Sequence, residues 1–388
     1  MKNSNSPGKG LVPPAMHGGN VYAAALANGR PMPKFIDFSA SINPLGLPPS
    51  VRRALGNAIP FSVHYPDPYG DDLRKQIGQS FRIDPESIVL GNGSAELISF
   101  LPRALSIRHG LVIGPTFMEF ERALALSGAQ STYLHARAED RYAPPLEQVQ
   151  SMLKKKKRIG RAGTNERPSS RPPIDAVFLC NPNSPTGRAV SRTGIRQLLQ
   201  TVQQVKAYLI VDEAFVDFCQ SCSVLKDVAK SLNLIVIRSF TKFFAMPGLR
   251  IGYVVGPRDL VTRIRCLLPP WSVNSLAQAA ALAALQDLGY RRRSVALIRR
   301  ERVRFMSRLK GLPGVRLFPS HANFLLLELP PNHSAARIAE WCREQGVLVR
   351  DCQDFSGMNR RSLRLAVHRG KENDQLVKLL MHALTVCE

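Results

Sequence analysis

Short apolar runs that end in turn-forming or polar residues recur in the first two thirds of the chain. Four of them, at 88–90, 177–179, 208–211 and 234–237, are followed by glycine, asparagine, aspartate or serine within a few positions. Runs of this length, bounded by turn residues, are typical of strands that are buried on both faces. The pattern therefore predicts a set of buried, mostly parallel strands.

The C-terminal third shows a different pattern. An alanine- and leucine-rich stretch from Leu276 to Leu288 predicts a helix, and strand-like runs follow at 324–327 and 347–349. A length of 388 residues also exceeds that of one ordinary domain. We expect an N-terminal arm, a large α/β domain with a basic loop insertion, and a small C-terminal α+β domain. Their predicted limits are 1–47 (with 1–14 flexible), 48–270 (with the loop at 154–173) and 271–388.

The strand predicted at 234–237 leads into a segment with candidate chemistry. Ser239 is followed by Lys242, a Pro-Gly turn and Arg250. A lysine at the end of a strand, with hydroxyl groups and a cation beside it, suits covalent imine chemistry next to a phosphate, as pyridoxal phosphate requires. A solvated loop lysine is the simplest alternative. The Ser-x-x-Lys spacing of penicillin-binding enzymes lacks its companion motifs here.

A glycine turn after the run 88–90 predicts an anion site. Gly91 and Gly93 precede Ser94 and Ala95, where a helix is expected to begin. Glycines allow close approach of the backbone, and a helix N-terminus presents free N–H groups. No Gly-Lys-Ser/Thr follows, which excludes a Walker loop. An ordinary strand-to-helix loop is the alternative.

Polar residues follow the two middle runs. Asn183 and Ser184 lie in a turn after 177–179, where a side chain could bond the phenolic oxygen of the cofactor. Asp212 ends the run 208–211, and a carboxylate there can hold a pyridine nitrogen protonated. Its alternative role is a helix N-cap. About 30 residues separate Asp212 from Lys242, which is roughly one strand–crossover–strand unit, so both can reach the same sheet edge.

These segments, in this order, resemble the fold-type I pyridoxal-phosphate enzymes of the class I/II aminotransferase superfamily, from about His17 onwards. The resemblance implies an α/β fold with a mostly parallel sheet between helices and a smaller C-terminal α+β domain. It implies that Lys242 binds pyridoxal 5'-phosphate covalently and that Asp212 pairs with the pyridine nitrogen. Further cofactor contacts are implied for Ser94, Ala95, Phe117, Ser239 and Arg250, and for Tyr65 of a neighbouring subunit in a homodimer.

The chain departs from the superfamily pattern at two positions. Ser184 stands directly before Pro-Thr-Gly, where asparagine is usual, so the contact to the phenolic oxygen stays open between Asn183, Ser184 and a water. Phe215 stands where tyrosine is frequent, which removes one hydroxyl from the same oxygen. Neither departure removes the predicted site.

The N-terminal motifs resemble one branch of the superfamily, the threonine-phosphate decarboxylases. The motifs are His-Gly-Gly-Asn at 17–20, Asp-Phe-Ser-Ala-Ser-Ile-Asn-Pro-Leu-Gly at 37–46 and Tyr-Pro-Asp-Pro-Tyr-Gly at 65–70. The resemblance implies decarboxylation of threonine phosphate to aminopropanol phosphate for cobalamin biosynthesis. Residues implied to bind the substrate are His17, Gly18, Ser41, Arg350 and Arg364, the last two because a guanidinium forks onto an anion.

Two other functions stay open at this point. Histidinol-phosphate aminotransferases share most of the motifs, and the reactions diverge in which bond at Cα is held perpendicular to the cofactor ring. The second alternative is a catalytically silent basic binding protein on the same scaffold. The presence of Lys242, Asp212 and Arg364 together disfavours it.

Charge and cysteine usage change this picture little. The formal net charge is +24, and part of it lies in the loop predicted at 154–173, whose field would attract phosphorylated substrates. It could also attract nucleic acid nonspecifically, but no dedicated nucleic-acid motif is present. The seven cysteines are scattered, and only Cys219 and Cys222 have redox-motif spacing. Incidental reduced thiols, no metal site, no membrane span and a cytoplasmic location are expected.

Overall fold

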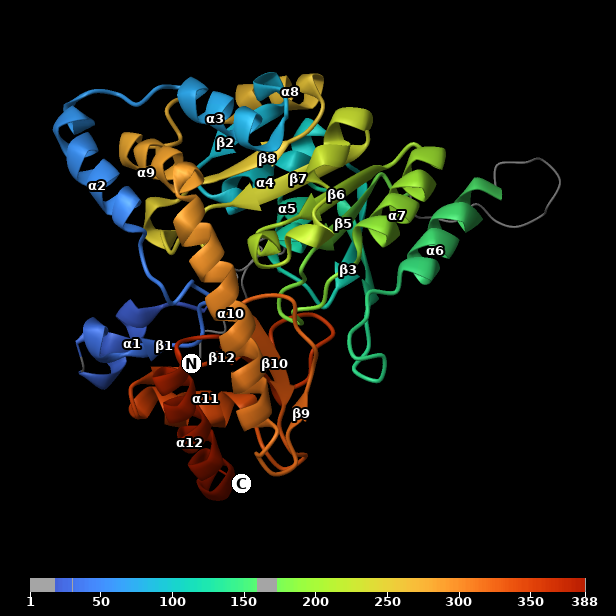
Figure 1. Cartoon of the computed structure of the whole chain (residues 1–388). Coiled ribbons are helices and arrows are strands. Elements are labelled where there is room, and N and C mark those ends of the chain that lie inside the picture. Colours follow the sequence, from blue (N-terminus) through green and yellow to red (C-terminus); the bar gives the residue numbers. More distant parts are fainter. Residues whose placement is uncertain (1–17, 30, 159–172, 388) are drawn as a thin grey trace, which may run out of the picture.

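The computed structural model describes residues 18–29, 31–158 and 173–387. It consists of a large unit built around a central sheet and a smaller unit that contains the C-terminus, with the long helix α10 running from one to the other (Figure 1). The flexible segment predicted at 1–14 lies outside the described residues. So does most of the predicted basic loop at 154–173.

The large unit contains a seven-stranded sheet in the order β2-β8-β7-β6-β5-β3-β4. Neighbouring strands are parallel except that β8 is antiparallel to both β2 and β7. All four apolar runs predicted as strands lie in this sheet. The strands are β2 (Ile88–Gly91), β3 (His109–Gly114), β4 (Gln130–His135), β5 (Ala176–Cys180), β6 (Tyr208–Asp212), β7 (Leu234–Ser239) and β8 (Gly252–Val255).

Helices cover both faces of this sheet because successive strand residues point to opposite faces and both sets are apolar. In β6, Leu209 and Val211 join one buried cluster, whereas Ile210 joins the other. The first cluster includes residues of α3 (Asp71–Phe81), α6 (Leu146–Arg158) and α7 (Arg192–Gln204). The second includes residues of α4 (Ser94–Ala104), α5 (Glu119–Leu126) and α8 (Arg258–Leu267).

The smaller unit contains an antiparallel sheet in the order β12-β13-β10-β9. Its strands are β9 (Arg316–Leu317), β10 (Phe324–Glu328), β12 (Arg350–Asp351) and β13 (Ser362–Ala366), and its helices are α10 (Leu288–Leu309), α11 (Ala335–Glu344) and α12 (Gly370–Val386). The helix predicted at 276–288 is α9 (Ser275–Gln286), which packs against α2 (Pro49–Ala58) and α3.

The N-terminal segment connects the two units. After α1 (Val21–Asn28), strand β1 (Ile36–Asp37) pairs in parallel with β11 (Val347–Leu348), the first part of the run predicted at 347–349. Phe38 then packs against Phe305 of α10, with ring centroids 6.2 Å apart. The short 3-10 helices are η1 (Met32–Lys34), η2 (Ile59–Val63), η3 (Pro85–Ser87), η4 (Val216–Phe218), η5 (Gln220–Cys222), η6 (Leu225–Lys230) and η7 (Pro247–Leu249).

No helix in the described part of the chain has both the length and the apolar character needed to cross a membrane.

A buried ionic network fixes the loop that follows β6. The Arg238 guanidinium lies 2.9 Å from a carboxylate oxygen of Glu213 and 3.3 Å from one of Asp217. All three side chains are buried, and the Arg238 guanidinium also lies 5.3 Å from the ring centroid of Phe81. A buried carboxylate needs such a partner because burial without one disfavours its charged form. Arg238 therefore holds the chain directly after Asp212 in place.

The variant Arg238→Met tests this role. Asp217 keeps Arg291, whose Nη2 lies 3.5 Å from its Oδ1, but buried Glu213 loses its guanidinium partner, and breaking such a buried pair costs about 3–5 kcal/mol. We expect the free energy of unfolding, measured by urea denaturation, to fall by about that amount. As a matched control, Arg258→Met removes an exposed pair with Asp84 and should cost less than about 1 kcal/mol. Equal losses in the two variants would contradict the assigned role.

Candidate active site

A cavity of about 590 Å³ opens beside the carboxyl ends of β5, β6 and β7. Its wall combines residues of the N-terminal segment, the large unit and the small unit. Twelve of the residues singled out in the sequence line it: Gly18, Ser41, Ser94, Ala95, Phe117, Ser184, Asp212, Ser239, Lys242, Arg250, Arg350 and Arg364. The parallel pairing of β5, β6 and β7 brings together side chains that are far apart in sequence.

Asp212 and Lys242 face this cavity from the ends of adjacent strands. Asp212 is buried, and its Oδ1 accepts a hydrogen bond of 2.9 Å from the Ala214 N–H. Burial raises the pKa of Asp212 to about 7. Burial, together with the charges of Arg364 and Arg250, lowers the pKa of Lys242 to about 8. A cationic ring nitrogen beside Asp212 would balance the negative charge of the carboxylate. Asp212 and Lys242 together therefore fit pyridoxal phosphate.

An anion cradle lies at the start of α4. The helix begins at Ser94 without a side-chain cap, because Gly93, with φ of 81°, precedes it. A Cβ atom on Gly252 would come within 2.6 Å of the Ser94 backbone nitrogen, and one on Gly93 within 2.4 Å of Arg250 Nη2. Only glycine fits at these positions. Uncapped N–H groups beside a guanidinium are what a phosphate group needs.

Two hydroxyl groups complete this cradle. Ser239 Oγ and Thr241 Oγ1 lie 2.8 Å apart, and both residues line the cavity beside Lys242. Ser239 is the last residue of β7, and its register partner on β8 is Gly252. One part of the cavity wall thus contains the residues that were predicted to contact the cofactor around its phosphate, namely Ser94, Ala95, Ser239 and Arg250.

The two side chains that were candidates for binding the phenolic oxygen of the cofactor, Asn183 and Ser184, have different surroundings. The Asn183 amide nitrogen donates to Pro115 O and to Thr186 Oγ1, each at 2.8 Å, and its oxygen accepts from Thr116 Oγ1. Asn183 is therefore occupied in holding its own turn and does not line the cavity. Ser184 does line it, and Phe215 lies on the same wall without a hydroxyl group.

Arg364 reaches the cavity from β13 and is fixed by two bonds. Its Nη1 donates to Ser184 Oγ and its Nη2 to Ser39 O, both at 2.8 Å. Arg364 Nε and Ser41 Oγ are buried, and neither has a hydrogen-bond partner within the described residues. Buried polar atoms without a partner are uncommon, and at a cavity wall they indicate a place for a ligand.

Arg350 lies directly opposite Arg364, because the two are register partners on the antiparallel strands β12 and β13. Its Nη2 pairs with Asp354 Oδ2 at 2.6 Å, and its guanidinium lies 5.2 Å from the ring centroid of Phe355. Two cations thus share one wall of the cavity with Ser41.

Two predicted residues are not placed on this wall. His17 lies outside the described residues. Tyr65 is 80% exposed and stacks on Trp271, with ring centroids 4.5 Å apart. It does not line the cavity of its own chain.

The wall also contains residues that were not among the predicted site residues, including Asp37, Thr241 and Phe355. Asp37 Oδ1 accepts hydrogen bonds from the Ser39 N–H and hydroxyl and from the Ala40 N–H, and its charge favours the protonated form of Lys242. Its position at the start of an Asp-Phe-Ser motif was the available signal. Thr241, next to Lys242, could have been found in the same way. No motif in the sequence around Phe355 indicated that this residue would line the cavity.

Comparison with known proteins places this site in a family. The family model Aminotransferase class I and II matches residues 33–380. The chain is 32% identical to threonine-phosphate decarboxylase of Salmonella typhimurium, over 95% of this chain and 96% of that protein. It is 33% identical to histidinol-phosphate aminotransferase of Roseiflexus castenholzii, over 91% and 90%.

Among solved structures, L-threonine-O-3-phosphate decarboxylase from Porphyromonas gingivalis is similar with a TM-score of 0.75 and 26% identity, over 90% of this chain and 99% of that one. The predicted α/β fold class is confirmed by these matches. The chain belongs to the class I and II aminotransferase family.

Proposed function

We propose that this enzyme uses pyridoxal 5'-phosphate to decarboxylate L-threonine O-3-phosphate, releasing CO2 and (R)-1-amino-2-propanol O-2-phosphate for cobalamin biosynthesis. Two of the similar proteins named above are threonine-phosphate decarboxylases, which supports this choice over an aminotransferase. A cytoplasmic location is part of the proposal, in keeping with the free state of all seven cysteines.

The observation that carries the proposal is the pair of arginines in register. Side chains directly opposite each other on antiparallel strands have Cβ atoms about 4.5–5.5 Å apart, and like charges there repel. Asp354 offsets part of the charge of Arg350, but Arg364 Nε has no hydrogen-bond partner within the described residues, so this wall still offers cationic groups to an anionic substrate. Threonine phosphate carries both a carboxylate and a phosphate. Histidinol phosphate carries a phosphate and no carboxylate and would use one of the two cations, whereas the 2-oxoglutarate of an aminotransferase would use both. The relatives named above therefore favour the decarboxylase, and the test below separates the two reactions.

When bound, pyridoxal phosphate supplies a ring that accepts the electron pair left on Cα after a bond to Cα breaks. Asp212 would hold the proton on the ring nitrogen, and the start of α4 with Ser239 and Arg250 would hold the phosphate of the cofactor. Lys242 would anchor the cofactor covalently. Its amine, whose pKa is lowered to about 8, is also suited to return a proton to Cα after CO2 has left.

The arginines would then select the reaction. Anions held at fixed positions on one wall fix the rotation of the substrate about its bond to the amino nitrogen, and this sets which bond of Cα stands perpendicular to the ring. Arg364 is well suited to this role because Ser184 and Ser39 hold its guanidinium from two sides. The N-terminal segment and the large unit thus jointly position a cation of the small unit.

The direct test is CO2 release from O-phospho-L-threonine by the cofactor-loaded protein. We expect release by the wild type and its loss, by several orders of magnitude, in Lys242→Ala. The matched control Lys226→Ala removes an exposed lysine and should retain full release. If CO2 is absent and glutamate forms from 2-oxoglutarate and histidinol phosphate, the protein is an aminotransferase and the proposal fails.

The pKa of Lys242 makes a second prediction. In the cofactor-free protein its amine should lose its proton near pH 8, because burial and the charges of Arg364 and Arg250 disfavour the cation. Labelling with trinitrobenzenesulfonate, followed by mass spectrometry of the Lys242 peptide, should therefore reach half its maximal rate near pH 8. An ordinary lysine does so above about pH 10. A midpoint above pH 10 for Lys242 would contradict the assigned environment.

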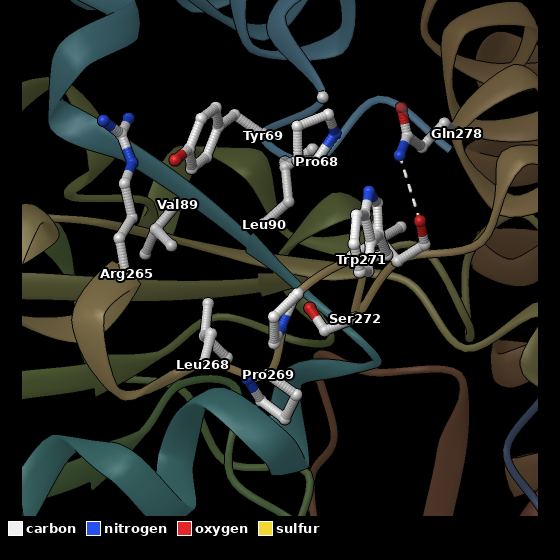
Figure 2. A pocket seen from close by; sticks show the side chains of 13 residues that line it. Pro68, Tyr69, Val89, Leu90, Arg265, Leu268, Pro269, Trp271, Ser272 and Gln278 are labelled. Carbon is white, nitrogen blue, oxygen red and sulfur yellow. Dashed lines mark hydrogen bonds between the residues drawn. The ribbon is translucent and has the colours of Figure 1, made fainter. Parts of the chain in front are cut away.

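A homodimer is the second part of the proposal. The segment from η2 to α3 exposes large apolar side chains, and one of them, Tyr69, lines a cavity of about 340 Å³ that is separate from the site of Lys242. Figure 2 shows Tyr69, Leu90 and Trp271 around this cavity, with Arg265 at its side. Exposed aromatic patches of this kind mark interaction surfaces. A second copy of the chain would cover the patch and bring Tyr65 towards the cofactor phosphate of its partner.

The dimer makes its own prediction. Light scattering should give twice the chain mass of 42.9 kDa for the wild type. In Trp271→Arg the apolar contact is replaced by a charge in the cavity that Arg265 also lines, so the mass should fall towards that of a single chain. The matched control Leu232→Arg alters an exposed apolar residue elsewhere and should remain dimeric. A wild type that stays monomeric at micromolar concentration would exclude the dimer.

A further inference from the structure

The turn that follows β6 brings two cysteines together. Cys219 lies between η4 and η5, and Cys222 is the last residue of η5. The Cys222 N–H donates a hydrogen bond of 2.9 Å to the Cys219 carbonyl oxygen. This bond closes a β-turn, in which the first and fourth Cα atoms lie less than about 7 Å apart. Disulfides need Cα separations of roughly 4.4–6.8 Å. The backbone thus holds both residues at bridging distance.

The two sulfur atoms differ in access. Cys219 is half-buried, whereas Gln220 and Ser221, at the tip of the turn, are exposed, and Cys222 is buried. A reagent in solution therefore meets Cys219 more readily than Cys222. This is the division that a pair of attacking and resolving thiols requires.

The surroundings favour the reactive form of the first thiol. A hydrogen bond from Cys222 is the main cause that lowers the pKa of the Cys219 thiol, and Ser221 and the charge of Arg302 act in the same direction, against partial burial. Arg302 is held in place because its Nη1 donates to Ala322 O at 2.8 Å. The thiolate is the nucleophilic form of cysteine, and such partly exposed, electropositive positions are where reactive cysteines occur.

We propose that Cys219 and Cys222 form a reversible disulfide, with Cys219 as the attacking thiol and Cys222 as the resolving thiol, when a low-molecular-weight disulfide acts as oxidant. The Cys219 thiolate attacks one sulfur of the oxidant, whose S–S bond breaks and releases one thiolate. The Cys222 thiol then loses its proton and attacks the Cys219 sulfur, which expels the second small thiolate. Two protein thiols are oxidised and one small disulfide is reduced to two thiols. This site is independent of the proposed function.

The turn that would contain the disulfide is hydrogen-bonded to the residues that directly follow β5 and β6. The Cys222 carbonyl accepts from the Asn181 amide at 3.5 Å. Ser223 Oγ and the Val224 N–H donate to the two oxygens of Glu213, at 2.8 and 2.7 Å. The turn with the two thiols is therefore tied to the residue next to Asp212.

The test exposes the full-length holoenzyme to oxidised glutathione, followed by acid quenching, trypsin digestion and mass spectrometry. The segment between Lys206 and Lys226 is a single tryptic peptide whose only cysteines are Cys219 and Cys222. In the wild type we expect this peptide to lose two hydrogen atoms without retaining glutathione, and dithiothreitol should restore it. In Cys222→Ser, whose hydroxyl can still donate to Cys219, the peptide should retain one glutathione.

Cys266 provides an internal control because it is exposed and lies outside this turn. It should accumulate glutathione at least about tenfold more slowly than Cys219 in Cys222→Ser. A wild-type peptide that retains glutathione would overturn the role of Cys222. A wild-type peptide that stays reduced while Cys266 is modified would overturn the site itself, and this outcome needs no variant to fold.

Discussion

The site depends on the parallel pairing of three strands. In β5, β6 and β7 the register aligns Cys180 with Asp212 and Asp212 with Ile237, so the chain leaves all three strands at one sheet edge. Parallel strands of this kind are stable only when both faces are buried, and the two apolar clusters meet that condition. The polar residues that follow the strands then have no place in the core. They converge at the edge, where Asp212 and Lys242 come to face one cavity.

Burial at this edge shifts the pKa values of the two ionisable groups in opposite directions. Asp212 and Lys242 both lie where water is scarce, so the carboxylate tends to keep a proton and the amine tends to lose one. A cationic ring nitrogen beside the first and a covalent bond to the second remove both costs. The two side chains therefore suit a ligand that places a cation beside Asp212 and an aldehyde beside Lys242.

The sequence pattern predicted those site residues whose positions depend only on the strand that precedes them. Asp212, Lys242 and Ser94 each stand where an apolar strand ends, and that position in the chain fixes their place at the sheet edge. The choice between Asn183 and Ser184 could not be made in this way. It depends on Thr116, which occupies Asn183, and on Arg364, which binds Ser184 across a separation of 180 residues. Phe355 was missed for the same reason, since its place against Arg350 follows from the fold of the small unit.

The hydrogen bond from Arg364 to the Ser39 carbonyl joins positions 325 residues apart, and β1 finds its partner β11 over a similar span. During synthesis, the large unit is complete in sequence long before either contact can form. A nascent chain can thus form the seven-stranded sheet and the anion cradle at the start of α4 while the cavity still lacks the wall that the small unit contributes. The pocket can close only after β11 and β13 have left the ribosome, so the chain gains its complete substrate site late in synthesis.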